Sequence, residues 1–113
     1  MNLFALVGRI VYQPELTELD SGRITTRIKL AVLRPFKNSE TNEYDTDFIP
    51  ITMWEGLAKT VNEYCKKGTL VCIRGRVVEE SFINKDNKKV SITTLIGEQL
   101  SILSHPSTKT EEE

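Results

Sequence analysis

Two large aromatic side chains, Phe48 and Trp54, share one face of a short segment that alternates like a β-strand. Side chains alternate between the two faces of a strand, so the opposite face carries Ile49, Ile51 and Met53 and is the better candidate for a core. Large aromatics that face water need something to cover them or something to stack on. Either a helix, a loop or a second subunit covers this pair, or the two rings bind a flat ligand.

Two further aromatics fall in polar segments that are predicted to form hairpin loops. Phe36 lies within residues 34–46, which read RPFKNSETNEYDT, and Phe82 lies just before the turn at residues 84–87. The first segment is long for a tight turn, so we expect a projecting hairpin or a flexible loop. Cations accompany both rings. Aromatics beside cations on such arms suit stacking on nucleic-acid bases together with contacts to phosphate.

The strand predicted over residues 23–34 carries the firmest local basic signal. Its alternation places Arg23, Arg27 and Lys29 on the outward face, opposite a row of apolar side chains. An ordinary solvated face explains this row equally well. If the row instead binds a polyanion, its phosphate contacts would come from a wider pool of cations. That pool is Arg9, Arg27, Lys29, Arg34, Lys37, Arg74, Arg76, Lys85 and Lys88.

The chemistry available to these residues is stacking combined with charge neutralisation. Phe36, Phe48, Trp54 and Phe82 would offer ring faces to unpaired bases. Each such stack is worth about 1–3 kcal/mol and tolerates any base. Duplex DNA hides the faces of its bases, so a preference for single strands follows without any base-reading group. Binding of this kind weakens as salt is added.

Five predicted strands and one helix position these side chains. A helix is predicted over residues 55–67, because apolar side chains from Leu57 through Tyr64 recur at helical spacing and Gly68 can stop it. The strands are predicted at residues 2–13, 23–34, 48–54, 69–82 and 90–103. An all-β chain with one helix between its third and fourth strands has the order of an OB-fold, a five-stranded Greek-key barrel that binds oligonucleotides on one face.

Composition limits the other function classes. The chain has 113 residues and a net charge of −1, which fits one small domain without an overall basic field. It has one histidine, His105, no Gly-rich phosphate loop and no Cys/His cluster, so we expect no enzymatic activity, no metal and no cofactor. Cys65 and Cys72 lack metal-binding spacing and are expected to be reduced. No apolar run reaches membrane length, so a soluble intracellular protein is expected.

The domain organisation follows from the polar C-terminus. We expect one binding domain over residues 1–103 and a disordered acidic tail over residues 104–113, which end in three glutamates.

Several fragments, in their order and spacing, resemble the bacterial single-stranded DNA-binding protein family over about residues 3 to 103. The fragments are Leu6-Val7-Gly8-Arg9-Ile10, Leu30-Ala31-Val32, Asp47-Phe48-Ile49, Trp54-Glu55-Gly56-Leu57-Ala58, Tyr64-Cys65-Lys66-Lys67-Gly68 and Val71-Cys72-Ile73-Arg74-Gly75-Arg76. The resemblance implies an OB-fold and sequence-independent binding of single-stranded DNA in replication, recombination, repair or DNA uptake. It also implies a homotetramer built from dimers, a cytoplasmic, nucleoid-associated location, and stacking by Phe36, Phe48, Trp54 and Phe82.

The C-terminus departs from the family pattern. Many members continue through a long linker to an acidic tip that ends in Pro-Phe and recruits protein partners, whereas this sequence ends in Glu111-Glu112-Glu113. We therefore expect a short form without tail-mediated partners, such as a paralogue linked to DNA uptake or one from a mobile element. Two alternative functions stay open: an OB-fold protein-interaction module of the primosome type, and an RNA-binding OB domain.

Overall fold

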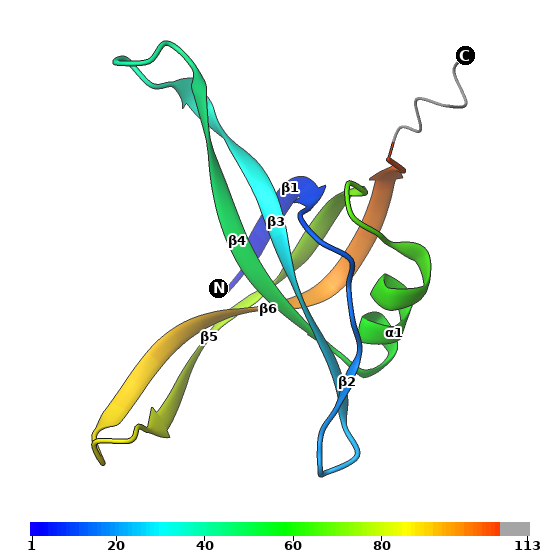
Figure 1. Ribbon diagram of the computed structural model, residues 1–113, viewed down its shortest axis with the longest axis vertical. Helices are drawn as coiled ribbons and strands as arrows, with labels where there is room; N and C mark the ends of the chain where they lie inside the picture. Colours follow the sequence, from blue (N-terminus) through cyan, green and yellow to red (C-terminus); the bar gives the residue numbers. More distant parts are fainter. Residues whose placement is uncertain (107–113) are drawn as a thin grey trace.

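The computed structural model describes residues 1–106, in which the strands close into a small barrel with one helix packed at its end (Figure 1). The elements are β1 (Phe4–Ile10), β2 (Thr17–Glu18), β3 (Ile24–Lys37), β4 (Tyr44–Trp54), α1 (Glu55–Tyr64), β5 (Leu70–Ile83) and β6 (Lys89–Ser104). The predicted fold is confirmed, with α1 between the third and fourth long strands. The two-residue strand β2 is an addition that the sequence pattern does not predict.

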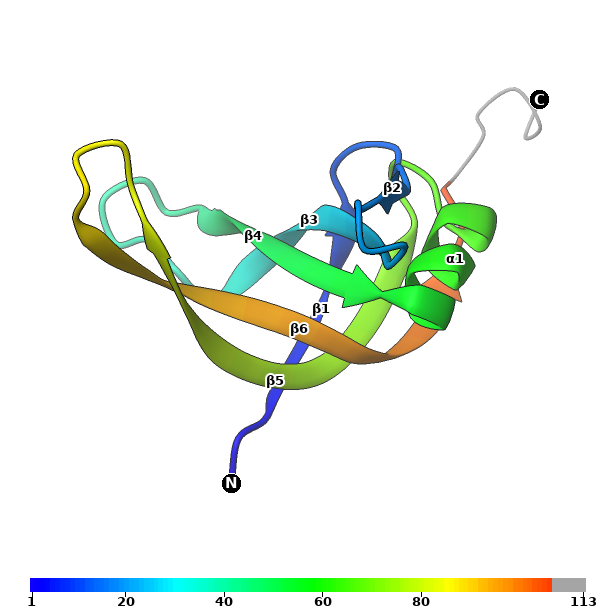
Figure 2. The ribbon, with the colours of Figure 1, turned by 90° about the horizontal axis from the view of Figure 1, so that it is seen from below.

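Pairing between β1 and β3, the first and second long strands, closes the barrel. Neighbouring strands follow the order β1-β5-β6-β4-β3-β2, and β1 also pairs with β3 at Ile10 and Leu30. β4 meets β6 through the parallel pair Thr52 and Ile96, whereas the other pairings are antiparallel. Figure 2 shows the strands wrapping around one interior, with α1 at one end. This is the closed five-stranded barrel of an OB-fold.

Alternate residues of neighbouring strands fill the interior. The β3–β4 register sets Ile28 against Ile51 and Thr26 against Met53, and all four are buried. The apolar faces predicted for these two strands are confirmed as the inward ones. Burying one such aliphatic side chain stabilises the fold by about 1.5–3 kcal/mol. The apolar side chains with no exposed area are Ile28, Leu30, Ile51, Met53, Ala58, Val61, Val71 and Ile73.

Helix α1 ends at Tyr64, before the predicted end at residue 67. Cys65 already has an extended backbone, with φ −114° and ψ 150°, and Gly68 lies in a later turn with φ +92°. The chain leaves the helix because the Gly68 N–H donates a hydrogen bond of 2.8 Å to the Ile10 carbonyl, which ties this segment to β1. The predicted packing of Tyr64 on the apolar side of the helix is also wrong, since the residue is 58% exposed.

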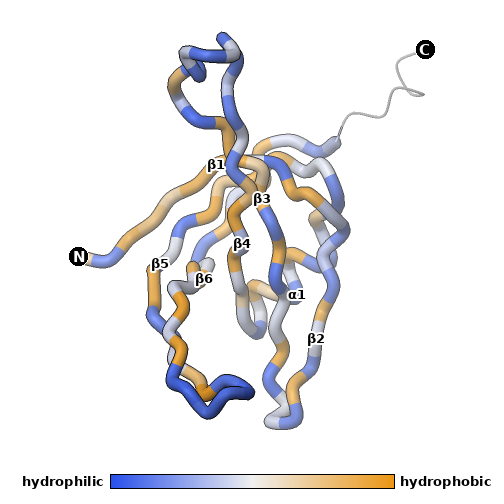
Figure 3. Tube along the Cα trace, turned by 60° about the vertical axis from the view of Figure 1, so that its left-hand side comes forward, coloured by the Kyte–Doolittle hydropathy of each residue, from blue (hydrophilic) through white to orange (hydrophobic). Residues whose placement is uncertain are grey.

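Two hairpins extend from the barrel as separate arms (Figure 1). β3 and β4 continue to the pair Lys37 and Tyr44, and β5 and β6 continue to the pair Ile83 and Lys89. Of the two possibilities expected for residues 34–46, a projecting hairpin and a flexible loop, the structure shows the hairpin. β3 and β4 extend further into their arm than predicted, because polar segments without apolar alternation still pair through their backbones. β5 and β6 match their predicted bounds to within one residue, whereas β1, predicted over residues 2–13, is shorter. Figure 3 shows that both arms end in hydrophilic residues, whereas β1 is largely hydrophobic.

In the described part of the chain, neither the cysteines nor the other potential metal-ligating side chains form a further candidate site. Cys65 and Cys72 are free thiols, and burial raises the pKa of the Cys65 thiol, which makes it a poor nucleophile. Within residues 1–106, no group of three or more His, Cys, Asp or Glu could hold a metal ion. The same residues include no helix that is long and apolar enough to cross a membrane.

Glycine is required where two backbones approach closely. A Cβ atom at Gly8 would lie 2.5 Å from the carbonyl oxygen of Ala31, and a Cβ at Gly75 would overlap the carbonyl oxygen of Ile96. Gly75 sits where β5 pairs with β6 across a register shift, so the obstacle is backbone and cannot rotate away. Gly56 in α1 is different, because a Cβ there would meet nothing within 4 Å.

We predict that Gly75→Ala lowers the free energy of unfolding by about 3 kcal/mol or more, since an overpacked site must shift backbone atoms. Gly56→Ala is the matched control and should stabilise the protein by up to about 1 kcal/mol, because alanine is the better helix residue. Urea denaturation followed by circular dichroism measures both. Equal stability of Gly75→Ala and wild type would contradict the close approach.

Candidate nucleic-acid interface

The outer surface of β3 and β4 brings aromatic and basic side chains together. We call it the β3–β4 face and define it by four opposed pairs of outward residues. The pairs are Thr25 and Trp54, Arg27 and Thr52, Lys29 and Pro50, and Ala31 and Phe48. Opposed residues of an antiparallel pair lie on the same side of a sheet, so the two rings flank the two cations. Phe48 and Trp54 are separated by about 20 Å along the strand.

The two rings of the β3–β4 face differ in exposure. Phe48 is 58% exposed, and nothing in residues 1–106 seals its outer side. Trp54 is half-buried, and the guanidinium of Arg23 lies over its ring, 4.0 Å from the centroid. Phe48 is therefore open to a flat ligand, whereas one face of the Trp54 ring is already covered from within the chain.

Among residues 1–106, no carboxylate pairs with the two cations between the rings. Arg27 is exposed and Lys29 is half-buried. Within the described part of the chain, neither side chain makes a hydrogen bond or an ion pair. An anion that lies along the face therefore has no internal partner to displace from either side chain.

Arg9 extends the β3–β4 face onto β1. β1 pairs Arg9 with Ala31, which is opposite Phe48, so the three residues form one row across three strands. One guanidinium nitrogen of Arg9, Nη1, donates to the Gly68 carbonyl at 2.8 Å, which holds the side chain in place. A mainly apolar hollow of about 590 Å³ lies beside this row. Its lining residues are Val7, Gly8, Arg9, Ala31, Leu33, Thr46 and Leu70.

The arm formed by the ends of β3 and β4 carries Phe36, which is 80% exposed. Phe36 lines a hollow of about 420 Å³ together with Arg34 and Lys37. The Lys37 ammonium lies 5.9 Å from the centroid of the Tyr44 ring. An exposed ring with a nearby ammonium group is the combination that stacks on a base and contacts its phosphate.

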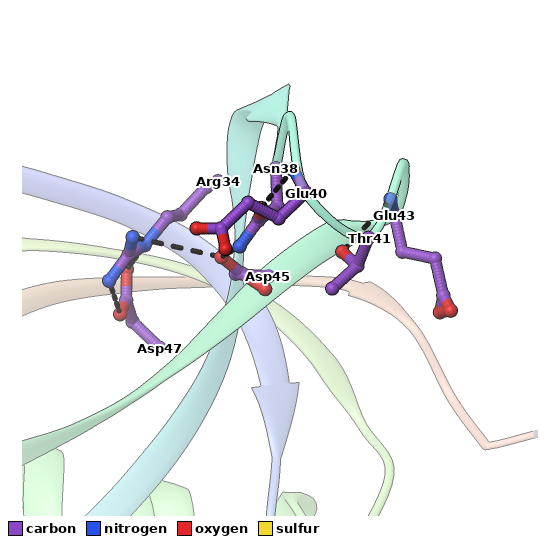
Figure 4. Close-up of polar contacts among 7 residues, drawn as sticks. All are labelled: Arg34, Asn38, Glu40, Thr41, Glu43, Asp45 and Asp47. Carbon is purple, nitrogen blue, oxygen red and sulfur yellow. Dashed lines mark hydrogen bonds and ion pairs between the residues drawn. The ribbon is translucent and has the colours of Figure 1, made fainter.

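Arg34, however, is engaged with acidic residues of the same arm (Figure 4). Its Nε and Nη2 atoms donate to the two carboxylate oxygens of Asp47, each at 3.0 Å, and Nη1 lies 3.9 Å from Asp45. The hydrogen bond from Arg34 lowers the pKa of the Asp47 carboxyl, and the same bond raises the pKa of Arg34. A phosphate must therefore compete with Asp47 for this predicted contact.

Arg74 and Arg76 lie on another wall of the barrel. β5 is separated from β4 by β6 and from β3 by β1, so the two arginines do not join the β3–β4 face. Arg74 donates to Gln99, and Arg76 pairs with Glu98 at 3.0 Å. Both are exposed, but the structure places them as a separate group whose charge is partly compensated.

The β5–β6 arm holds the remaining predicted residues. Phe82 is 48% exposed and pairs with Val90 near the end of the arm. Lys85 and Lys88 follow in the turn, which is ordered by Asn84, because its side-chain oxygen accepts hydrogen bonds from the backbone N–H groups of residues 86 and 88 at 2.9 and 3.0 Å. The predicted residues thus fall into a continuous β3–β4 group and a second group on this arm.

Arg23 contacts the Trp54 ring but is not among the residues predicted to bind. The alternation places Arg23 outward, but its position over Trp54 depends on how the start of β3 lies beside the end of β4. No local sequence signal reports that register. Glu55, which follows Trp54 in the sequence, pairs with Arg23 at 3.4 Å. This pairing could be inferred only once the alignment of β3 with β4 is known.

Known proteins are similar to this chain over most of its length. The model of the single-strand binding protein family matches residues 1–103. Single-stranded DNA-binding protein 3 of Listeria innocua is 37% identical over 103 residues, which are 91% of this chain and 64% of that protein. Single-stranded DNA-binding protein B of Bacillus subtilis is 33% identical over 97 residues, which are 86% of this chain and 85% of that protein. The chain spans 61% of the single-stranded DNA-binding protein of Halalkalibacterium halodurans, at 35% identity.

Proposed function

The chain belongs to the single-strand binding protein family, and on that premise we propose that it binds single-stranded DNA without sequence preference. The β3–β4 face carries this proposal. It presents the open ring of Phe48, with Arg27 and Lys29 beside it, and neither cation has an acidic partner within residues 1–106. Stacking accepts any base, because every base has a flat face, and the cations contact the backbone that all sequences share.

The path of the strand follows the positions of the aromatics. From Trp54 it runs along the β3–β4 face past the two cations to Phe48, and then along the β3–β4 arm to Phe36. Phe82, Lys85 and Lys88 on the β5–β6 arm form a second contact area. The function is binding rather than catalysis. Its role would be to protect unpaired DNA in the cytoplasm, at the nucleoid, during replication, recombination, repair or DNA uptake.

We also propose that the chain assembles into a homotetramer from dimers. β1 supports this, because residues 4–8 pair with β5 on one side only, which leaves a strand edge able to pair with another chain. Val7 and Leu33 are 50% and 64% exposed beside the hollow described above. Exposed apolar patches of this kind are typical of protein interfaces. A second copy at this edge would cover both side chains.

Trp54 is the single tryptophan, so its fluorescence reports on one position of the proposed site. We predict strong quenching by oligo-dT, weaker quenching by oligo-rU and little by a duplex of equal length, with all effects reduced at high salt. Anisotropy of a labelled oligonucleotide provides a second measure of binding. Unchanged emission and anisotropy with oligo-dT, in protein shown to be folded, would refute the proposed function.

Phe48→Ala should weaken binding of oligo-dT by about 1–3 kcal/mol, or roughly 5- to 150-fold in Kd, because one stacking contact is lost. Tyr64→Ala is a matched control. Tyr64 is also 58% exposed but lies at the end of α1, so we expect its Kd to stay within about twofold of wild type. Equal losses in the two variants, measured by anisotropy titration, would argue against stacking on the β3–β4 face.

Sedimentation equilibrium should show four chains per particle for the wild type and smaller species for Val7→Glu, because a buried charge without a partner disfavours the interface. Leu16→Glu provides the control. Leu16 is 41% exposed in the segment before β2, away from β1, and its replacement should leave the tetramer intact. A monomeric wild type at micromolar concentration would contradict the proposed assembly.

A further inference from the structure

Three residues form a clamp at one end of the β3–β4 face. The Arg23 guanidinium lies over the Trp54 ring at 4.0 Å, and its Nε atom donates to Glu55 Oε2 at 3.4 Å. The Arg23 and Glu55 side chains are 57% and 53% exposed, so the clamp lies at the surface. We refer to Arg23, Trp54 and Glu55 as the Trp54 clamp.

Glu55 is held in place independently of Arg23. Its backbone has φ +52°, in the left-handed region that residues other than glycine rarely adopt. The same oxygen, Oε2, also accepts a hydrogen bond from the Ile24 backbone N–H at 3.4 Å. In addition, Glu55 begins α1, where the helix dipole favours a negative charge. The carboxylate therefore keeps favourable partners if Arg23 moves away.

The clamp conflicts with stacking in its present form. A base cannot occupy the ring face of Trp54 that the guanidinium covers. The ion pair that holds the guanidinium is weak, since exposed pairs contribute little and are screened by salt. A phosphate offers Arg23 a stronger, bidentate partner at the place where a bound strand would run.

Resting on the proposed binding of single-stranded DNA, we infer that Arg23 exchanges Glu55 for a backbone phosphate when the strand binds. The exchange uncovers Trp54 for stacking and adds one phosphate contact. Glu55 thereby acts as a built-in competitor of the DNA that lowers affinity. Arg23 is a DNA-binding residue that is paired with Glu55 in the free protein, and Glu55 is the residue that positions it there.

Affinity for oligo-dT, measured by anisotropy over a series of salt concentrations, tests the exchange. Arg23→Ala should weaken binding about fivefold and reduce the slope of log K against log[salt] by about 0.7, the value for one phosphate on a single strand. Glu55→Gln should tighten binding roughly threefold, because the competitor is gone and the residue keeps its shape. In the Arg23→Ala background, Glu55→Gln should have no effect.

Two further variants make the outcomes unambiguous. Glu63→Gln removes another exposed acid from α1, away from Trp54, and should leave affinity unchanged. The exchange is overturned if Arg23→Ala tightens binding or leaves the salt slope intact. It is also overturned if Glu55→Gln tightens binding equally with and without Arg23, which would indicate only a general effect of charge. Phe48→Ala distinguishes failure of the exchange from failure of the proposed function. If Phe48→Ala weakens binding while Arg23→Ala changes neither the affinity nor the salt slope, the exchange alone is refuted. Absence of wild-type binding refutes the proposed function as well.

Discussion

The pairing register of β3 with β4 is the constraint on which the rest of the structure depends. Ile28 opposes Ile51 inside the barrel, and this alignment places Ala31 opposite Phe48 outside it. Because strand side chains have a period of two, a shift of one residue would bury Arg27 and expose Ile28. Burial of the core pairs therefore fixes which rings and cations face the solvent. The same contacts stabilise the barrel and arrange the β3–β4 face.

Local charge, rather than total charge, decides where a polyanion can lie. The chain is close to neutral, with 15 basic and 16 acidic side chains. Arg34 and Arg76 are paired with Asp47 and Glu98 on exposed surfaces, which leaves them less available to phosphate. Arg27 and Lys29 have no such partners in the described residues. A protein with little net charge can thus present a short basic stretch beside an open aromatic ring, because other basic side chains are paired with acidic ones.

The parts of the fold that follow local rules could be predicted from the sequence. Alternation identifies the inward residues of β3 and β4, and one amphipathic segment identifies α1. The end of α1 could not be predicted, because a hydrogen bond from Gly68 to Ile10 of β1 competes with further helical turns. The extension of β3 and β4 into their arm could not be predicted, since polar residues pair through backbone atoms that leave no mark on the sequence pattern. Of the tail predicted over residues 104–113, Ser104 still belongs to β6, and residues 107–113 lie outside the described residues.

The candidate site, like the fold, has features that local sequence rules predict and features that depend on strand pairing. The exposure of Phe36 and Phe48 could be predicted from alternation and from the polar segment around residue 36. Which cations are neutralised could not, because Arg34 and Asp47 are brought together by strand pairing and not by their separation in sequence. The covering of Trp54 by Arg23 depends on the same register.

The most direct test of the account is an NMR measurement of contacts between protein and bound oligo-dT. Intermolecular NOEs between the ring protons of Phe48 and the thymine H6 or methyl protons are predicted, together with shift changes for Arg27 and Lys29. NOEs confined to α1 or to the β5–β6 wall, with an unperturbed Phe48 ring, would contradict binding of bases on the β3–β4 face.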